Sequence, residues 1–171
     1  MSNKKIDFSQ LTVEIEEKEN EIVYIFKGDV NENFIQNRLP IIPKERMVID
    51  LAQVENFNSC GTREWIFFVK SLTEVSKVVF RRCSIATIDQ INMIPDSLGS
   101  AVIESFYAPY YCPEHGESIQ LIEVSKCIEQ LKRGEAPEFL CKNCNKPLEF
   151  DALEESYFMF INEISEESKA S

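Results

Sequence analysis

The chain has 171 residues, of which 44% are apolar, 27% charged and 11% aromatic. This composition is typical of a globular protein and excludes collagen-like, low-complexity and wholly disordered chains. The formal net charge of -11 disfavours nucleic-acid binding, because that function needs clustered Lys and Arg to displace counterions from phosphates.

The first two thirds of the chain predict a mixed sheet. Alternating apolar residues over 11–15, followed by the β-rich run 22–26, indicate a hairpin. The nearly all-apolar run 47–51 suits a central strand that is covered on both faces, and residues 78–80 suit a second buried strand. Residues 101–107 predict a further strand, which gives a sheet of about five strands.

Helices are predicted between these strands. Asn58 or Ser59 can cap a helix whose apolar residues recur at i, i+3, i+4 and i+7, namely Trp65, Phe68, Val69 and Leu72. Ser84 can cap a second helix that Pro95 ends. A short helix is also expected over residues 34–39. The alternation of strands and helices predicts an α/β fold.

Residues 112–144 differ in composition from the rest of the chain. They contain four of the six cysteines and the only histidine. We therefore expect a domain over residues 10–110, a small zinc-ribbon-like module over residues 111–147, and a C-terminal strand and helix over residues 148–165 that pack back on the domain. A helix ended by Gly134 is expected inside the module.

The cysteines and the histidine form two pairs with metal-ligand spacing. Cys112 and His115 are separated by two residues, as are Cys141 and Cys144. A tight turn of this length aims both side chains at one ion, and the two pairs together supply a Cys3His tetrahedron. Zinc fits this donor set best. Because four protein ligands leave no position for water, the sequence predicts a structural zinc ion; reduced thiols on loops are the alternative.

The segment 48–61 carries a resemblance to a known family. An apolar strand that ends in Asp50-Leu51, a spacer, and then Asn58-Ser59-Cys60-Gly61 at the start of a helix resemble the signature of the STAS family of bacterial anti-sigma-factor antagonists. The resemblance covers residues 10–108 and implies the order of strands and helices described above. The zinc module and the last helix lie outside the usual extent of that domain.

The resemblance implies a partner-binding or regulatory loop at Asn58, Ser59, Cys60 and Gly61. In the family, the hydroxyl residue before the glycine is phosphorylated by a partner kinase that is also the anti-sigma factor. Cys60 occupies that position here and cannot hold phosphate stably, which leaves Ser59 as the neighbouring hydroxyl. The residues alone equally fit a simple helix start, with Asn58 or Ser59 as the cap and Gly61 in a tight turn.

The sequence thus predicts a non-catalytic protein–protein interaction module of bacterial signal transduction with a structural Zn2+. The resemblance implies a protein partner, either an anti-sigma-factor-type kinase or another signalling protein. Two alternatives remain open: a zinc-ribbon adaptor for nucleic acid or the transcription machinery, and a thiol-based redox sensor that uses Cys60. No secretory signal and no run of 18 apolar residues is present, so a cytoplasmic protein without membrane contact is expected.

Overall fold

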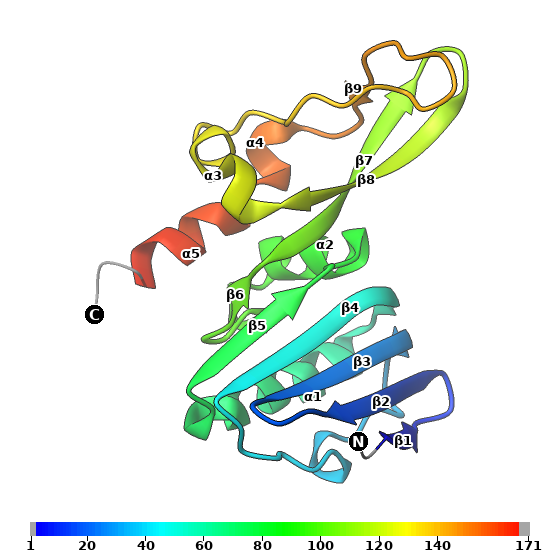
Figure 1. The fold of residues 1–171 in the computed structure, drawn as a ribbon. Coiled ribbons are helices and arrows are strands. Elements are labelled where there is room, and N and C mark those ends of the chain that lie inside the picture. Colours follow the sequence, from blue (N-terminus) through cyan, green and yellow to red (C-terminus); the bar gives the residue numbers. More distant parts are fainter. Residues whose placement is uncertain (1–2, 168–171) are drawn as a thin grey trace.

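The computed structural model describes residues 3–167, with side chains for residues 4–163, and confirms the α/β class. A mixed six-stranded sheet forms the lower part of the molecule in Figure 1, and a long hairpin that belongs to a second, three-stranded sheet rises from it. The last two residues of the predicted segment 148–165 are described for the backbone only.

The larger sheet has the strand order β1-β2-β3-β4-β5-β6. Its strands are β1 (Asn3–Asp7), β2 (Leu11–Glu17), β3 (Glu21–Val30), β4 (Arg46–Phe57), β5 (Lys77–Arg81) and β6 (Val102–Ile103). The first three strands are antiparallel and the pairs from β3 onward are parallel. The prediction of about five strands did not include β1, whose polar residues pair with β2 along their whole length.

One helix connects β4 to β5 and another connects β5 to β6, and both lie behind the sheet in Figure 1. They are α1 (Ser59–Lys70) and α2 (Ile85–Met93), each followed by a 3-10 turn, Ser71–Glu74 and Pro95–Ser97. The helix predicted over 34–39 is wrong: only a 3-10 turn, Gln36–Arg38, forms there. Pro40 follows Leu39 and holds it in an extended conformation, which ends the turn. Within the described residues, no helix has the length and apolar content to cross a bilayer.

Aromatic side chains fill the space between α1 and the sheet. Trp65 packs edge-on against Phe26 from β3 with ring centroids 5.3 Å apart, and Phe68 lies 5.8 Å from the same ring. The indole N–H of Trp65 donates to the carbonyl of Ser97 at 2.8 Å, so its polar atom is satisfied inside the core. The predicted apolar stripe of α1 is therefore its buried face.

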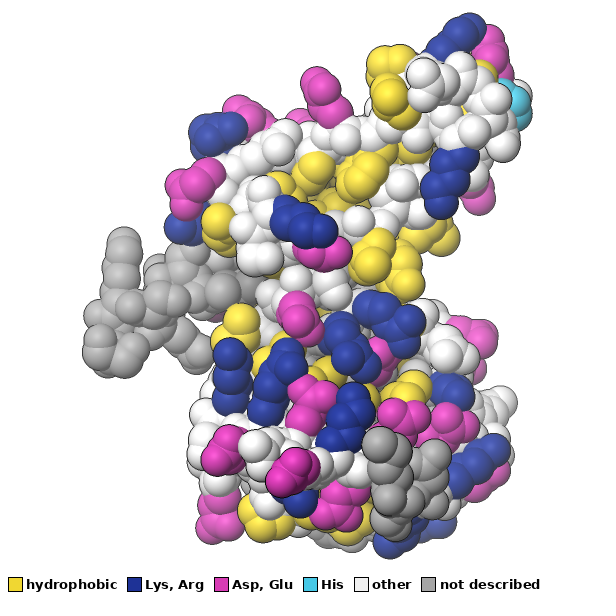
Figure 2. Space-filling model, in the orientation of Figure 1, with side chains coloured by type: hydrophobic (Ala, Val, Ile, Leu, Met, Phe, Trp, Pro, Cys, Tyr) yellow, Lys and Arg dark blue, Asp and Glu magenta, His cyan; other side chains and the backbone are white. Residues whose placement is uncertain are grey.

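The opposite face of the larger sheet is covered by long charged side chains instead of helices. Figure 2 shows Lys and Arg gathered over the middle of this face. Under them Val23, Val48 and Val79 form a small cluster that is almost completely buried. The apolar stems of charged side chains can cover such a cluster while the charged ends stay in water.

A fully buried carboxylate pairs with two arginines at the end of β5. Asp50 on β4 accepts hydrogen bonds from Arg81 and Arg82 at 3.1 and 2.9 Å, both at the same oxygen. Arg82 adopts a φ of 50°, a conformation that L-residues rarely adopt, and its N–H donates to the hydroxyl of Ser105. The buried Asp50 therefore links the end of β5 to the start of the second sheet.

The second sheet has the order β8-β7-β9 and is antiparallel. Its strands are β7 (Ser105–Cys112), β8 (Gly116–Glu123) and β9 (Glu149–Phe150), and its helices are α3 (Val124–Lys132), α4 (Glu154–Tyr157) and α5 (Phe160–Glu167). The strand predicted over 101–107 is divided between β6 and β7, which lie in different sheets. The second sheet thus takes a strand from within the predicted domain 10–110, and the C-terminal segment forms two helices instead of one.

The start of α1 lies directly against the end of β3. The N–H of Asn58 donates to the carbonyl of Val30 at 3.2 Å. A Cβ atom added to Gly61 would lie 1.9 Å from the same carbonyl oxygen. Gly61 is therefore required for the close approach of helix and strand. A tight turn at this glycine was expected from the sequence, but the φ of Gly61 is not positive.

Replacing Gly61 by Ala should lower the free energy of unfolding by about 3 kcal/mol, because α1 must move away from Val30. Urea unfolding of the purified protein measures the change. Gly134→Ala is the matched control, since open space surrounds this residue and only its φ of 71° opposes a side chain, at a cost of about 1 kcal/mol. An equal loss in both variants would contradict the steric explanation.

Candidate metal centre

The first pair of predicted ligands lies in the turn between β7 and β8. Cys112 is the last residue of β7, and the N–H of His115 donates to its carbonyl at 3.2 Å. Gly116 follows with a φ of 82°, which lets the chain reverse into β8 directly after the histidine.

The second pair lies in a turn of the same design. Asn145 donates its N–H to the carbonyl of Cys141 at 2.8 Å, and the N–H of Cys141 donates to the backbone carbonyl of Lys146 at 2.8 Å. Asn145 has a φ of 59°, so the residue after the second ligand is left-handed in both turns. Asparagine adopts this conformation more readily than other residues with a side chain.

The two turns bring their four ligand atoms together. The Sγ atom of Cys112 lies 3.5 Å from Nδ1 of His115 and 3.6 Å from Sγ of Cys144. The Sγ atom of Cys141 lies 3.6 Å from the same Nδ1, and all four ligand atoms are within 4.8 Å of one another. These residues are thus close enough to hold one metal ion.

The distances are compatible with a zinc ion. With Zn–S bonds of about 2.3 Å and Zn–N bonds of about 2.0–2.1 Å, a tetrahedral site places sulfurs about 3.8 Å apart and sulfur about 3.6 Å from nitrogen. A disulfide would need its sulfurs about 2.05 Å apart, which is far shorter than the 3.6 Å between Cys112 and Cys144. The donor set and its spacing therefore agree with zinc and not with an oxidised pair.

Hydrogen bonds within the second turn favour a thiolate at one cysteine. The N–H groups of Cys144 and Asn143 lower the pKa of the Cys141 thiol to about 6. The N–H of Lys146 acts in the same direction on Cys144, but partial desolvation and the adjacent Cys112 and Cys141 thiols outweigh it and raise the pKa of Cys144 to about 11. One thiolate thus opposes ionisation of its neighbour, and a bound cation would remove that repulsion.

Packing and one ion pair hold the two turns together. Lys146 from the second turn forms an ion pair with Glu114 of the first. Tyr110 of β7 donates its hydroxyl to the carbonyl of Pro137 at 2.7 Å, and its ring packs edge-on against Phe139. Cys112 and Cys141 are buried, whereas His115 is exposed. Because Nδ1 faces the sulfurs, the proton of a ligating His115 would be on Nε2.

The predicted regulatory loop lies elsewhere in the molecule. Asn58 accepts the N–H of Gly61 at 2.8 Å and is the N-cap of α1, while Ser59 and Cys60 are exposed. The amide of Asn58 also donates to Glu32 at 2.6 Å; the backbone N–H of Glu32 and this amide lower the pKa of the carboxyl group. Since α1 packs on the larger sheet and the metal ligands lie at the far end of the β7–β8 hairpin, the loop and the metal centre are separate sites (Figure 1).

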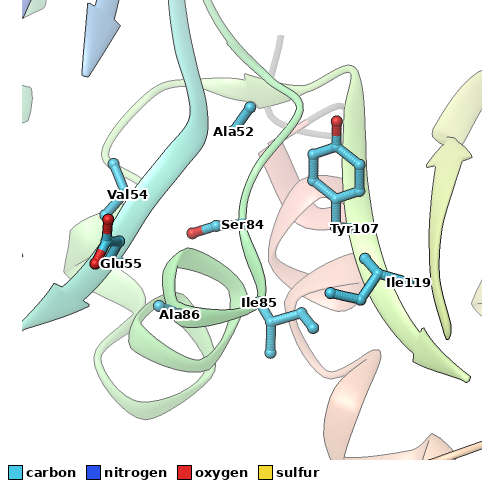
Figure 3. Close-up of a pocket in the computed structure, with 8 residues that line it drawn as sticks. All are labelled: Ala52, Val54, Glu55, Ser84, Ile85, Ala86, Tyr107 and Ile119. Carbon is cyan, nitrogen blue, oxygen red and sulfur yellow. The ribbon is translucent and has the colours of Figure 1, made fainter. Parts of the chain in front are cut away.

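A cleft of about 330 Å³ separates the two sheets on one side. Figure 2 shows the cleft as an indentation between the upper and lower parts of the molecule. Ile85 at the start of α2 and Ile119 on β8 both border it (Figure 3). The hydroxyl of Ser84 accepts the N–H of Thr87 and caps α2, so its acceptor role is used within the helix. The titratable side chains that line the cleft are Glu55 and Tyr107.

Several features of these sites were missed from the sequence. The left-handed Asn145 could have been recognised, because it follows the second ligand as Gly116 follows the first. The Glu114–Lys146 pair and the cleft depend on tertiary contacts and have no local signal.

No family model, curated protein or solved structure matches this chain.

Replacing Cys144 by Ser should reduce the zinc content of freshly purified protein from roughly one per chain to less than about half, because one of four ligands is lost. Elemental analysis after gel filtration measures the content. Cys60→Ser is the control, since this thiol is exposed and lies outside the cluster. Equal zinc content in both variants would contradict the site.

Removal of the metal should unfold the ligand turns and leave the larger sheet intact. We expect the order of residues 112–148 to depend on a bound ion, whereas Trp65 packs against Phe26 and Phe80 of the larger sheet. After treatment with a strong chelator, amide NMR signals from residues 112–148 should collapse while those of α1 stay dispersed. Unchanged signals in the ligand turns, or loss of signals throughout the chain, would contradict this expectation.

Proposed function

We propose that Cys112, His115, Cys141 and Cys144 hold a structural zinc ion. The supporting observation is the convergence of three sulfurs and one imidazole nitrogen within 4.8 Å of one another. Four protein donors complete a tetrahedron and leave no position for a water or a substrate, which is typical of structural rather than catalytic zinc. The ion therefore stabilises the end of the β7–β8 hairpin.

We further propose that the protein acts as a non-catalytic recognition module of bacterial signal transduction, with the Asn58–Gly61 loop as a contact site. The main support is the placement of Ser59 and Cys60, which are exposed although the residues on either side of them are fixed against Val30. A partner can read such a rigid, exposed helix start without a change in the fold. This matches what the STAS resemblance implies for these positions.

The chemistry of Cys60 distinguishes the proposed module from a phosphorylated one. A phosphate at this helix start would add up to two negative charges to a contact surface. Cys60 does not carry phosphate stably, so partner binding here is expected to be independent of a phosphate. The partner proposed is an anti-sigma-factor-type kinase or a related signalling protein in the cytoplasm.

The two alternative functions have less support in the side-chain contacts. The Lys and Arg side chains over the larger sheet include Lys27, Arg46 and Arg81, and these face Glu14, Glu21 and Asp50, respectively. A paired cation is a weak ligand for nucleic-acid phosphates. A redox or catalytic role for Cys60 needs a neighbouring base, but the chain's only histidine lies among the metal-site cysteines.

A photo-crosslinker attached at position 59 in living cells tests the recognition proposal. We expect one main adduct, with a protein that contains a kinase-type ATP-binding domain, and loss of that adduct when Cys60 is replaced by Arg. The same crosslinker at exposed position 117 on β8 is the control. The proposal is contradicted if the crosslinker yields no specific adduct, or if the captured kinase transfers phosphate stoichiometrically to Ser59.

A further inference from the structure

An apolar hollow lies between α2 and the C-terminal helices. Its volume is about 580 Å³, and Met93, Leu153 and Met159 are part of its lining. Leu153 is 78% exposed and Met93 75%, which are the two largest values among the exposed large hydrophobic residues of the described chain. Exposed apolar residues that gather in one concave place, unlike single ones, mark a binding surface.

Hydrogen bonds make this hollow part of the fixed structure. The side chain of Asn92 on α2 donates to the carbonyl of Tyr157 at 2.9 Å and accepts the N–H of Phe160 at 2.9 Å. Tyr157 in turn donates its hydroxyl to the carbonyl of Tyr107 on β7 at 2.7 Å. The segment that carries Leu153 and Met159 is thus tied both to α2 and to the second sheet, so the hollow is preformed.

The two chain segments that line the hollow carry only acidic charged side chains. The segments 83–100 and 147–163 contain no Lys or Arg. Their exposed carboxylates are Asp89, Asp96, Glu149, Asp151, Glu154, Glu155 and Glu163. Only Asp96 has an ion pair within the described residues, with Lys70 at 2.7 Å. The remaining acids leave a negative potential around the apolar centre.

Two of these acids border the apolar surface itself. Asp89 is part of the lining of the hollow, and partial desolvation there raises the pKa of its carboxyl group. Glu163 lines a smaller adjoining hollow of about 130 Å³, which shares Asn92 and Met159 with the first. Negative charge therefore lies along the hollow and not only on distant parts of the two segments.

We propose that this hollow binds a basic amphipathic segment of a partner protein, with apolar side chains on Met93, Leu153 and Met159 and with flanking Lys or Arg facing the acids. The acids repel phosphate-bearing ligands and anionic membranes, which favours a peptide. Methionine side chains adapt to different apolar shapes, as on other surfaces that bind amphipathic helices. The site is separate from the Asn58–Gly61 loop and does not depend on its proposed role.

A synthetic amphipathic helix made only of Leu and Lys, with a fluorescent label, is the probe for this site. We expect it to bind the full chain in fluorescence anisotropy, and to shift amide NMR signals over residues 89–93 and 151–160. The double variant Met93→Ser, Leu153→Ser should weaken binding about tenfold or more, because apolar burial is lost. Both side chains are exposed, so the fold is expected to survive the change.

Matched controls separate the site from general attraction to an acidic protein. Ile119→Ser removes an apolar residue that is 63% exposed at the other cleft and should leave the affinity unchanged. Cys60→Ser should also leave it unchanged, which keeps this test independent of the recognition loop. The proposal is overturned if the probe does not bind, if the double variant binds as tightly as the original chain, or if a helix of Leu and Glu binds equally well.

Discussion

The convergence of three sulfurs and one imidazole on a single point is the constraint on which the smaller sheet depends. The two ligand turns are separated by 25 residues, 116–140, so the chain must close a long loop to bring them together. Without a cation, the adjacent Cys112 and Cys141 thiols oppose ionisation of Cys144, whose pKa they raise. A metal ion held by the four side chains would offset the entropy of closing the loop.

The order imposed there reaches the rest of the molecule through aromatic packing. Tyr110, two residues before the first ligand, contacts Phe139 and Phe150, and Phe150 stacks on Phe158 with ring centroids 5.2 Å apart. Phe106, at the base of the same strand, packs on Phe160. The β7–β8 hairpin thus packs on the C-terminal helices, which Asn92 ties to α2, and the acidic hollow lies along that contact.

The parts of the fold with strong local patterns could be predicted from the sequence. The stripe that includes Trp65 and Phe68 predicted α1, the apolar run 47–51 predicted the first half of β4, and the spacing of the cysteine and histidine pairs predicted that these four side chains lie together. The failures have physical causes. Strand β1 is polar and is formed by pairing with β2, and the C-terminal segment is divided after Tyr157 into α4 and α5. Such contacts between distant segments leave no periodic signal.

X-ray absorption at the zinc edge of the purified protein tests directly whether these four side chains bind zinc. We expect a zinc edge with a first shell of about three sulfurs at roughly 2.3 Å and one nitrogen at roughly 2.0 Å. We expect no exchangeable water in that shell. A sample without zinc, or with a metal bound only through oxygen and nitrogen, would contradict the assignment of Cys112, His115, Cys141 and Cys144 as a structural centre.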